Sequence, residues 1–176
     1  MLWVCFFCLM ALSYILGTLV HGFKMSNELQ TYLWYPLYLL LCLSVAIFMM
    51  AVVYDIWGEA LSRRILPLMI FITGGIFFIT LYWPSSFLVF IIYESVIFFF
   101  VLGGYIWLAC QGYLEGAWLM AVGTFVALIA AVLQTSKSFS FTFIWSFDHN
   151  GVFHLVQMVA IVLILSGLRK SLLPRD

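Results

Sequence analysis

Residues 37–54, LYLLLCLSVAIFMMAVVY, form an apolar stretch that contains no charged side chain. An apolar stretch of about 18 residues or more is typical of an α-helix that crosses a lipid bilayer. Similar stretches recur along the chain, and we predict six membrane spans, at residues 2–22, 32–54, 66–82, 87–109, 116–133 and 151–168. The expected fold is all-α, a polytopic bundle of transmembrane helices that forms a single domain over residues 1–176, with a loop at about 134–150.

The composition of the whole chain agrees with a membrane location. Of the 176 residues, 66% are hydrophobic and 8% are charged, whereas about a quarter of the residues of a soluble domain are charged. Seven basic and seven acidic residues cancel, so there is no excess of positive charge to attract nucleic acid. The predicted partner is the lipid bilayer, and if the chain is an enzyme, an apolar bundle open to one leaflet suits a lipid substrate.

The positions of lysine and arginine predict how the bundle is oriented. Five basic residues fall on one side of the membrane, either between the second and third spans or in the tail: Arg63, Arg64, Arg169, Lys170 and Arg175. Two fall on the other side, Lys24 and Lys137. Because basic residues accumulate in cytoplasmic loops, we predict that both termini lie in the cytoplasm.

Local features of the helices give further expectations. Pro67 is expected in the first turn of the third span, where its missing N–H costs little. The pairs Gly74–Gly75 and Gly103–Gly104 are candidates for close helix approach. Cys5 and Cys8 form a C-x-x-C inside an apolar helix, which favours small buried packing residues over a redox or zinc motif.

Polar side chains gather on one side of the membrane. Because successive spans alternate in direction, the end of the first and fifth spans and the start of the fourth and sixth share a side. The residues concerned are His21, Glu94, Gln134, Asp148, His149, Asn150 and His154. Ionisable groups within spans are costly and often mark function. Two structural alternatives stay open: a neutral Glu94 hydrogen-bonded between helices, and a tight interface along Ser13, Gly17 and His21.

These side chains suit a zinc site. Asp148 or Asn150 can cap the sixth span, and with Asn150 as the cap His149 precedes the helix and can turn toward His154. Neutral imidazoles and a carboxylate are ligands that Zn²⁺ accepts in tetrahedral geometry. We therefore predict His21, His149 and His154 as metal ligands. Glu94 or Asp148 would be the catalytic carboxylate that orients or deprotonates a metal-bound water.

The same residues allow two other functions. His21 and His154 can serve as axial ligands of a haem in a membrane electron carrier. Alternatively, the chain is a non-catalytic scaffold or subunit, in which the polar cluster only holds the helices together.

Three stretches carry a resemblance to a known family. GTLVHGF at 17–23, AAVLQTS at 130–136 and FDHNGVFHLVQMV at 147–159 resemble small, uncharacterised bacterial polytopic membrane proteins. That family has an HN-x-x-x-H-x-x-Q signature at the start of its last span and a His-Gly at the end of its first. The resemblance implies a location in the bacterial inner membrane.

A more distant resemblance concerns the layout of the helices. Gly17-x-x-x-His21 on the first span and Asn150-x-x-x-His154 on the last are similar to the metal-binding motifs of alkaline ceramidases and adiponectin receptors. That resemblance implies zinc and hydrolysis of a lipid amide or a related lipid. The sequence departs from the pattern at Gly17, where those proteins have Ser, at Asn150, where they have His, and at Tyr32, where ceramidases have Asp.

Overall fold

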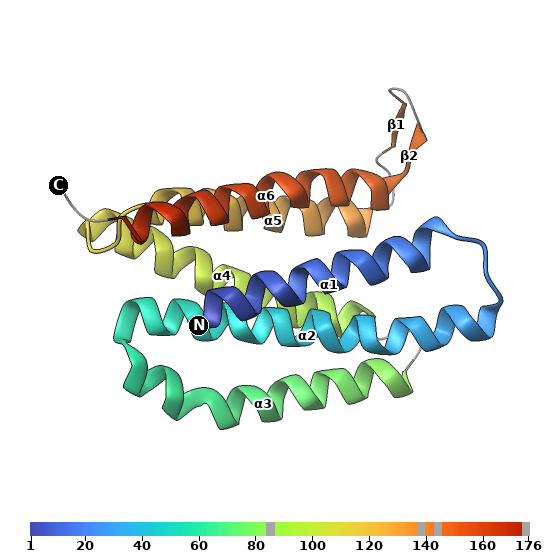
Figure 1. Ribbon diagram of the computed structural model, residues 1–176, viewed down its shortest axis with the longest axis horizontal. Coiled ribbons are helices and arrows are strands. Elements are labelled where there is room, and N and C mark those ends of the chain that lie inside the picture. The colour runs from blue at the N-terminus through green and yellow to red at the C-terminus, as the bar shows by residue number, and fades with distance from the viewer. Residues whose placement is uncertain (84–86, 137–139, 143–145, 174–176) are drawn as a thin grey trace. The chain divides into compact units, whose positions relative to one another are not determined.

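The computed structural model describes residues 1–83, 87–136, 140–142 and 146–173, which form six helices and a short hairpin (Figure 1). The elements are α1 (Leu2–Gly22), α2 (Asn27–Trp57), α3 (Glu59–Tyr82), α4 (Phe87–Gln111), α5 (Ala117–Ser136), β1 (Phe141–Thr142), β2 (Ser146–Phe147) and α6 (His149–Ser171). All six helices are long and apolar enough to cross a membrane. The prediction of six helices that could each span a membrane is therefore confirmed for the described residues, and the chain has the character of a multi-pass membrane protein.

Tertiary contacts divide the chain into two compact units, Met1–Glu94 and Ser95–Asp176, with the division inside α4. In the first unit, α2 packs against both α1 and α3 and lies between them (Figure 1). The ring of Phe6 on α1 stacks on Phe48 of α2, with centroids 4.9 Å apart. The Ser62 hydroxyl of α3 donates to the carbonyl oxygen of Met50 at 3.1 Å. The core of this unit is therefore built around α2.

Helix α2 is longer at both ends than the predicted span. Its 31 residues correspond to about 46 Å of helix, against a hydrocarbon core of about 30 Å. At its start, the Ser26 hydroxyl accepts the N–H of Leu29 at 3.3 Å, a capping contact. At its end, Gly58 takes φ 83°, a conformation that favours glycine, and α3 begins at the next residue. The ends of α2 therefore extend beyond the apolar stretch that defined the span.

The early start of α3 corrects the expectation for Pro67. Because α3 begins at Glu59 rather than near residue 66, Pro67 is inside the helix and not in its first turn. A proline there removes the backbone hydrogen bond to Arg63 four residues earlier. Hydropathy does not predict the first turns of α3, because the residues before Pro67 include several charged ones. Two of these, Glu59 and Arg63, form an ion pair four residues apart on the helix.

In the second unit, glycines bring α5 and α6 together. A β-carbon added at Gly123 would lie 2.7 Å from Ile164 Cγ1 and 2.9 Å from the carbonyl oxygen of Ala160. At Gly167 it would lie 2.5 Å from Met120 Cγ. Only glycine therefore fits at these two positions. Between the two helices, β1 and β2 pair antiparallel, with Phe141 opposite Phe147 and Thr142 opposite Ser146; the predicted loop thus contains a hairpin.

The structure differs from two expectations of the sequence analysis, one for the glycine pairs and one for Cys5 and Cys8. At Gly74, Gly75 and Gly103 an added β-carbon would meet nothing within 4 Å, so these positions do not mediate a close approach. Cys5 and Cys8 are exposed, and the expectation that they are buried packing residues is wrong. Within the first unit, both lie on a part of α1 that α2 and α3 leave exposed.

The orientation of the bundle stays a prediction. Two of the seven basic residues that support it, Lys137 and Arg175, lie outside the described residues.

Candidate functional site

Glu94 is placed by its neighbour on α4. The hydroxyl of Tyr93 lies 3.1 Å from Thr73 Oγ1 of α3, and both side chains are buried. Because consecutive helix residues are about 100° apart around the axis, Glu94 leaves α4 in a different direction from Tyr93. It is half-buried.

His21 lies in the last turn of α1 and is exposed. Its ring packs edge-on against Trp34 of α2, with centroids 5.3 Å apart and planes at 83°. The predicted ligand His21 thus packs against α2, whereas the predicted catalytic carboxyl, Glu94, lies on α4.

The tight helix interface expected along Ser13, Gly17 and His21 of α1 is present only in part. Ser13 and Gly17 are buried, which agrees with a helix interface. A β-carbon at Gly17 would meet nothing within 4 Å, so the approach there is not tight enough to require glycine.

Asp148, rather than Asn150, caps α6. Its carboxylate accepts the backbone N–H of Gly151 at 2.9 Å, and α6 begins at His149. His149 is therefore the first residue of the helix, and the arrangement in which it precedes the helix does not occur. His154 follows His149 by five positions, which places them about 140° apart around the axis. From α6 the two imidazoles therefore start in diverging directions.

The burial of Gln157 was not predicted from the sequence. It is 5% exposed, and among the described residues its Oε1 atom has no hydrogen-bond partner. It follows half-buried His154 by three residues and shares a helix face with Ala160 and Ile164, which pack on α5 at Gly123. The sequence showed that Gln157 lies beside His154, whereas its burial depends on the tight α5–α6 contact.

The structure does not bring the predicted site residues together within either unit. His21 and Glu94 belong to the first unit, and Asp148, His149 and His154 belong to the second. Among the residues that the structure describes, no group of three or more His, Cys, Asp or Glu side chains is placed to hold a metal ion. The three-histidine zinc site, whose ligands come from both units, remains a prediction.

Comparison with known proteins gives a family without an activity. No curated protein and no solved structure matches the chain. The model of a family of unknown function, DUF6962, matches residues 1–173. That match spans almost the whole sequence, and the chain therefore belongs to this family.

Proposed function

We propose that the chain is a non-catalytic integral membrane scaffold or subunit, whose polar residues hold its helices in place. The observation that carries this proposal is that two candidate site residues, a predicted metal ligand and a predicted catalytic carboxylate, have structural partners. His21 packs on Trp34, and Asp148 caps α6. Interhelical hydrogen bonds, such as that between Tyr93 and Thr73, contribute only about 0.6 kcal/mol on average in membranes, which is enough to select a packing without any chemistry.

A second candidate is the zinc-dependent hydrolase of a lipid substrate. It is supported by the order of the helices, because six crossings would bring the end of α1 and the starts of α4 and α6 to one side of the membrane. His21 and His154 would then supply imidazoles, and Glu94 or Asp148 a carboxylate. His149 would complete the ligand set only if the first turn of α6 were rearranged, since its position on the helix directs it away from His154. Zinc, when bound, would polarise a water molecule for attack on the lipid.

A haem carrier is the third candidate, with His21 and His154 as the axial ligands. For all three candidates we propose the bacterial inner membrane as the location, with both termini in the cytoplasm. The lipid bilayer is the proposed surrounding in each case, and a lipid is the substrate only for the hydrolase.

One experiment separates these candidates. The full chain is purified in detergent from zinc-replete cells, as wild type and as the variants His21→Ala, His154→Ala and Lys24→Ala. Zinc content, visible absorption and thermal unfolding are measured on each. Lys24 is exposed and follows the end of α1, so its variant is the control for a change at this end of the helix.

The scaffold predicts trace zinc, no Soret band and a lower midpoint of unfolding for His21→Ala than for Lys24→Ala. A content of about one zinc per chain that is lost in His154→Ala would contradict the scaffold and support the hydrolase, because a catalytic zinc needs its protein ligands. A Soret band that is lost in the same variant would instead support the haem carrier.

A further inference from the structure

Cys5 and Cys8 are two free, exposed thiols near the start of α1. Cys8 follows Cys5 by three positions, which places the two residues about 4.5 Å apart along the helix axis and about 60° apart around it. Side chains at this spacing are neighbours on the helix surface, with β-carbons about 5–6 Å apart. The two thiols therefore form one pair rather than two independent groups.

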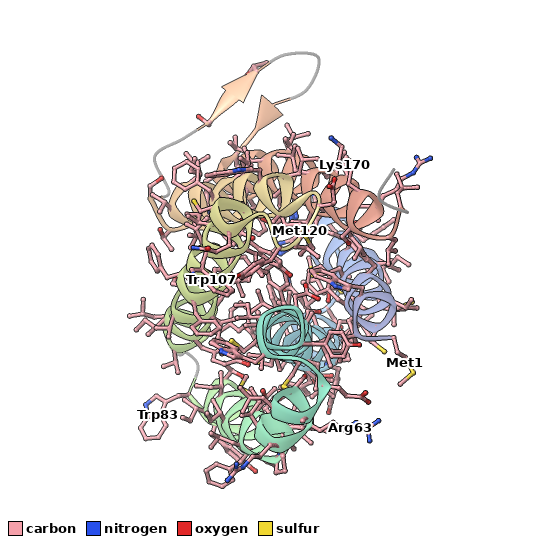
Figure 2. The ribbon with its side chains drawn as sticks, turned by 90° about the vertical axis from the view of Figure 1, so that its left-hand side faces the viewer. Met1, Arg63, Trp83, Trp107, Met120 and Lys170 are labelled. Carbon is pink, nitrogen blue, oxygen red and sulfur yellow. The ribbon has the colours of Figure 1, made fainter. Side chains whose placement is uncertain are left out.

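The packing of α1 on α2 directs this pair outward within the first unit. Phe6 is 3% exposed and stacks on Phe48 of α2, with ring centroids 4.9 Å apart. Relative to Phe6, Cys5 is rotated by about 100° and Cys8 by about 160° in the same sense around the helix axis. Met1, four positions before Cys5 and on the same side of the helix, is fully exposed (Figure 2). Both thiols thus lie on the side of α1 that turns away from α2.

The spacing of the two thiols is too wide for a disulfide of ordinary geometry. A disulfide needs β-carbons about 3.5–4.5 Å apart, whereas a regular helix holds these two about 5–6 Å apart. A metal ion between the sulfurs adds two bonds of about 2.3 Å each, the length of a zinc–thiolate bond, and so spans up to about 4.6 Å. The helix therefore presents two sulfurs at a separation that suits a shared metal ion.

The ligand set favours a soft cation of low coordination number. The side chains next to the pair at helical spacing, Val4, Leu9 and Leu12, offer no nitrogen or oxygen ligand. Structural zinc takes four ligands, and the part of the chain that the structure describes holds no group of three or more His, Cys, Asp or Glu for a metal. Thiolates select soft metals such as Cu(I), and Cu(I) accepts two sulfur ligands in a nearly linear arrangement.

We propose that Cys5 and Cys8 bind one Cu(I) ion between them, on the side of α1 that turns away from α2. Two S–H bonds are replaced by two Cu–S bonds, so that Cu⁺ and two thiols give a complex with one negative charge and two protons, which pass to water. No electron is transferred, and the copper therefore has to arrive already reduced. On the cytoplasmic side that we propose for the N-terminus, thiols remain reduced, as this binding requires.

This site is independent of the scaffold, hydrolase and haem assignments, because it uses none of their residues. The test is a titration of the reduced full chain, in detergent and without oxygen, with Cu(I) that ascorbate keeps reduced. Bathocuproine disulfonate competes for the metal, and its colour reports the Cu(I) that the protein leaves unbound. We expect the wild type to bind one Cu(I) per chain.

Single variants identify the ligands. Cys5→Ser and Cys8→Ser should each weaken binding by more than about 100-fold, since loss of even an outer-shell partner of a metal site costs about 10–100-fold. Cys110 is an exposed free thiol near the end of α4, and Cys110→Ser is the matched control. It should bind Cu(I) as the wild type does.

Two double variants test the spacing while the number of thiols on α1 stays the same. Leu12 is 51% exposed and follows Cys8 by four positions, so Leu12→Cys with Cys5→Ala keeps two neighbouring thiols and should still bind one Cu(I). Leu12→Cys with Cys8→Ala leaves thiols seven positions and about 10 Å apart, too far to share one ion. This second variant should bind as weakly as Cys8→Ser.

Three results would overturn the proposal. The first is a wild-type protein that takes up no Cu(I) in competition with the chelator. The second is equal affinity of the two double variants, which would show that the thiols act independently. The third is one Cu(I) per two chains together with a dimer in light scattering, which would move the site to an interface between copies. The first and third are measured on the wild type, so they do not depend on whether a variant folds.

Discussion

A β-carbon added to Gly167 would lie 2.7 Å from the carbonyl oxygen of Gly116. That separation is too short for a carbon and an oxygen that are not bonded, so the two backbones are in direct contact. Gly116 also takes φ 77° as the chain enters α5, which a residue with a side chain adopts only with strain. In lipid, where helices gain little from the hydrophobic effect, such close contacts are a main source of association.

Gly123→Ala should destabilise the α5–α6 pair. The new methyl group would have to displace Ile164 and the backbone at Ala160, and overpacking of this kind costs about 1–3 kcal/mol. Gly75→Ala is the matched control, because an added β-carbon there meets nothing within 4 Å. Thermal unfolding in detergent checks both; if the two variants were equally stable, the glycine contact would not hold the helices together.

Tyr93→Phe should weaken the contact between α3 and α4 by about 0.5–1.5 kcal/mol, the usual contribution of one hydrogen bond. Thr73→Val should cost a similar amount, since it removes the other partner of the 3.1 Å contact. A double-mutant cycle measured by denaturant unfolding tests the pair. Additive losses would show that the two hydroxyls do not interact.

Asp148→Ala should expose the first turn of α6, because the side chain no longer accepts the Gly151 N–H. Loss of such a cap costs about 1 kcal/mol. Hydrogen exchange should accelerate at the first amides of α6, and Asp148→Ser, which retains a capping oxygen, should restore most of the protection. Equally fast exchange in both variants would mean that the role of Asp148 is not capping and would favour the catalytic carboxylate.

Both termini should lie on the cytoplasmic side, because of the basic residues around Arg63 and in the tail. Reporter domains that are active only in the cytoplasm should therefore work when they are fused to either end. The same reporter inserted next to Lys24 is the control and should be inactive. Activity at one terminus only would contradict an even number of crossings.

The six spans could be predicted because the length of an apolar stretch is a local property. The stretch at 37–54 has to be shielded from water whatever it packs against, and its helix satisfies every backbone group internally. The ends of the helices could not be predicted in the same way, because α2 and α3 extend through polar residues that hydropathy assigns to loops. At Asp148 and Asn150 the sequence allowed either cap, and the structure selects Asp148.

The sequence by itself therefore determined a six-helix membrane protein and the polar residues available to it. Only the tertiary structure decided which residues meet: Gly123 with Ala160 and Ile164, Tyr93 with Thr73, and His21 with Trp34. The physical reason is that a membrane helix is apolar on all sides. Hydrophobic periodicity, which marks the buried face of a helix in water, does not distinguish a neighbouring helix from lipid, so contacts depend on steric fit and on a few polar groups.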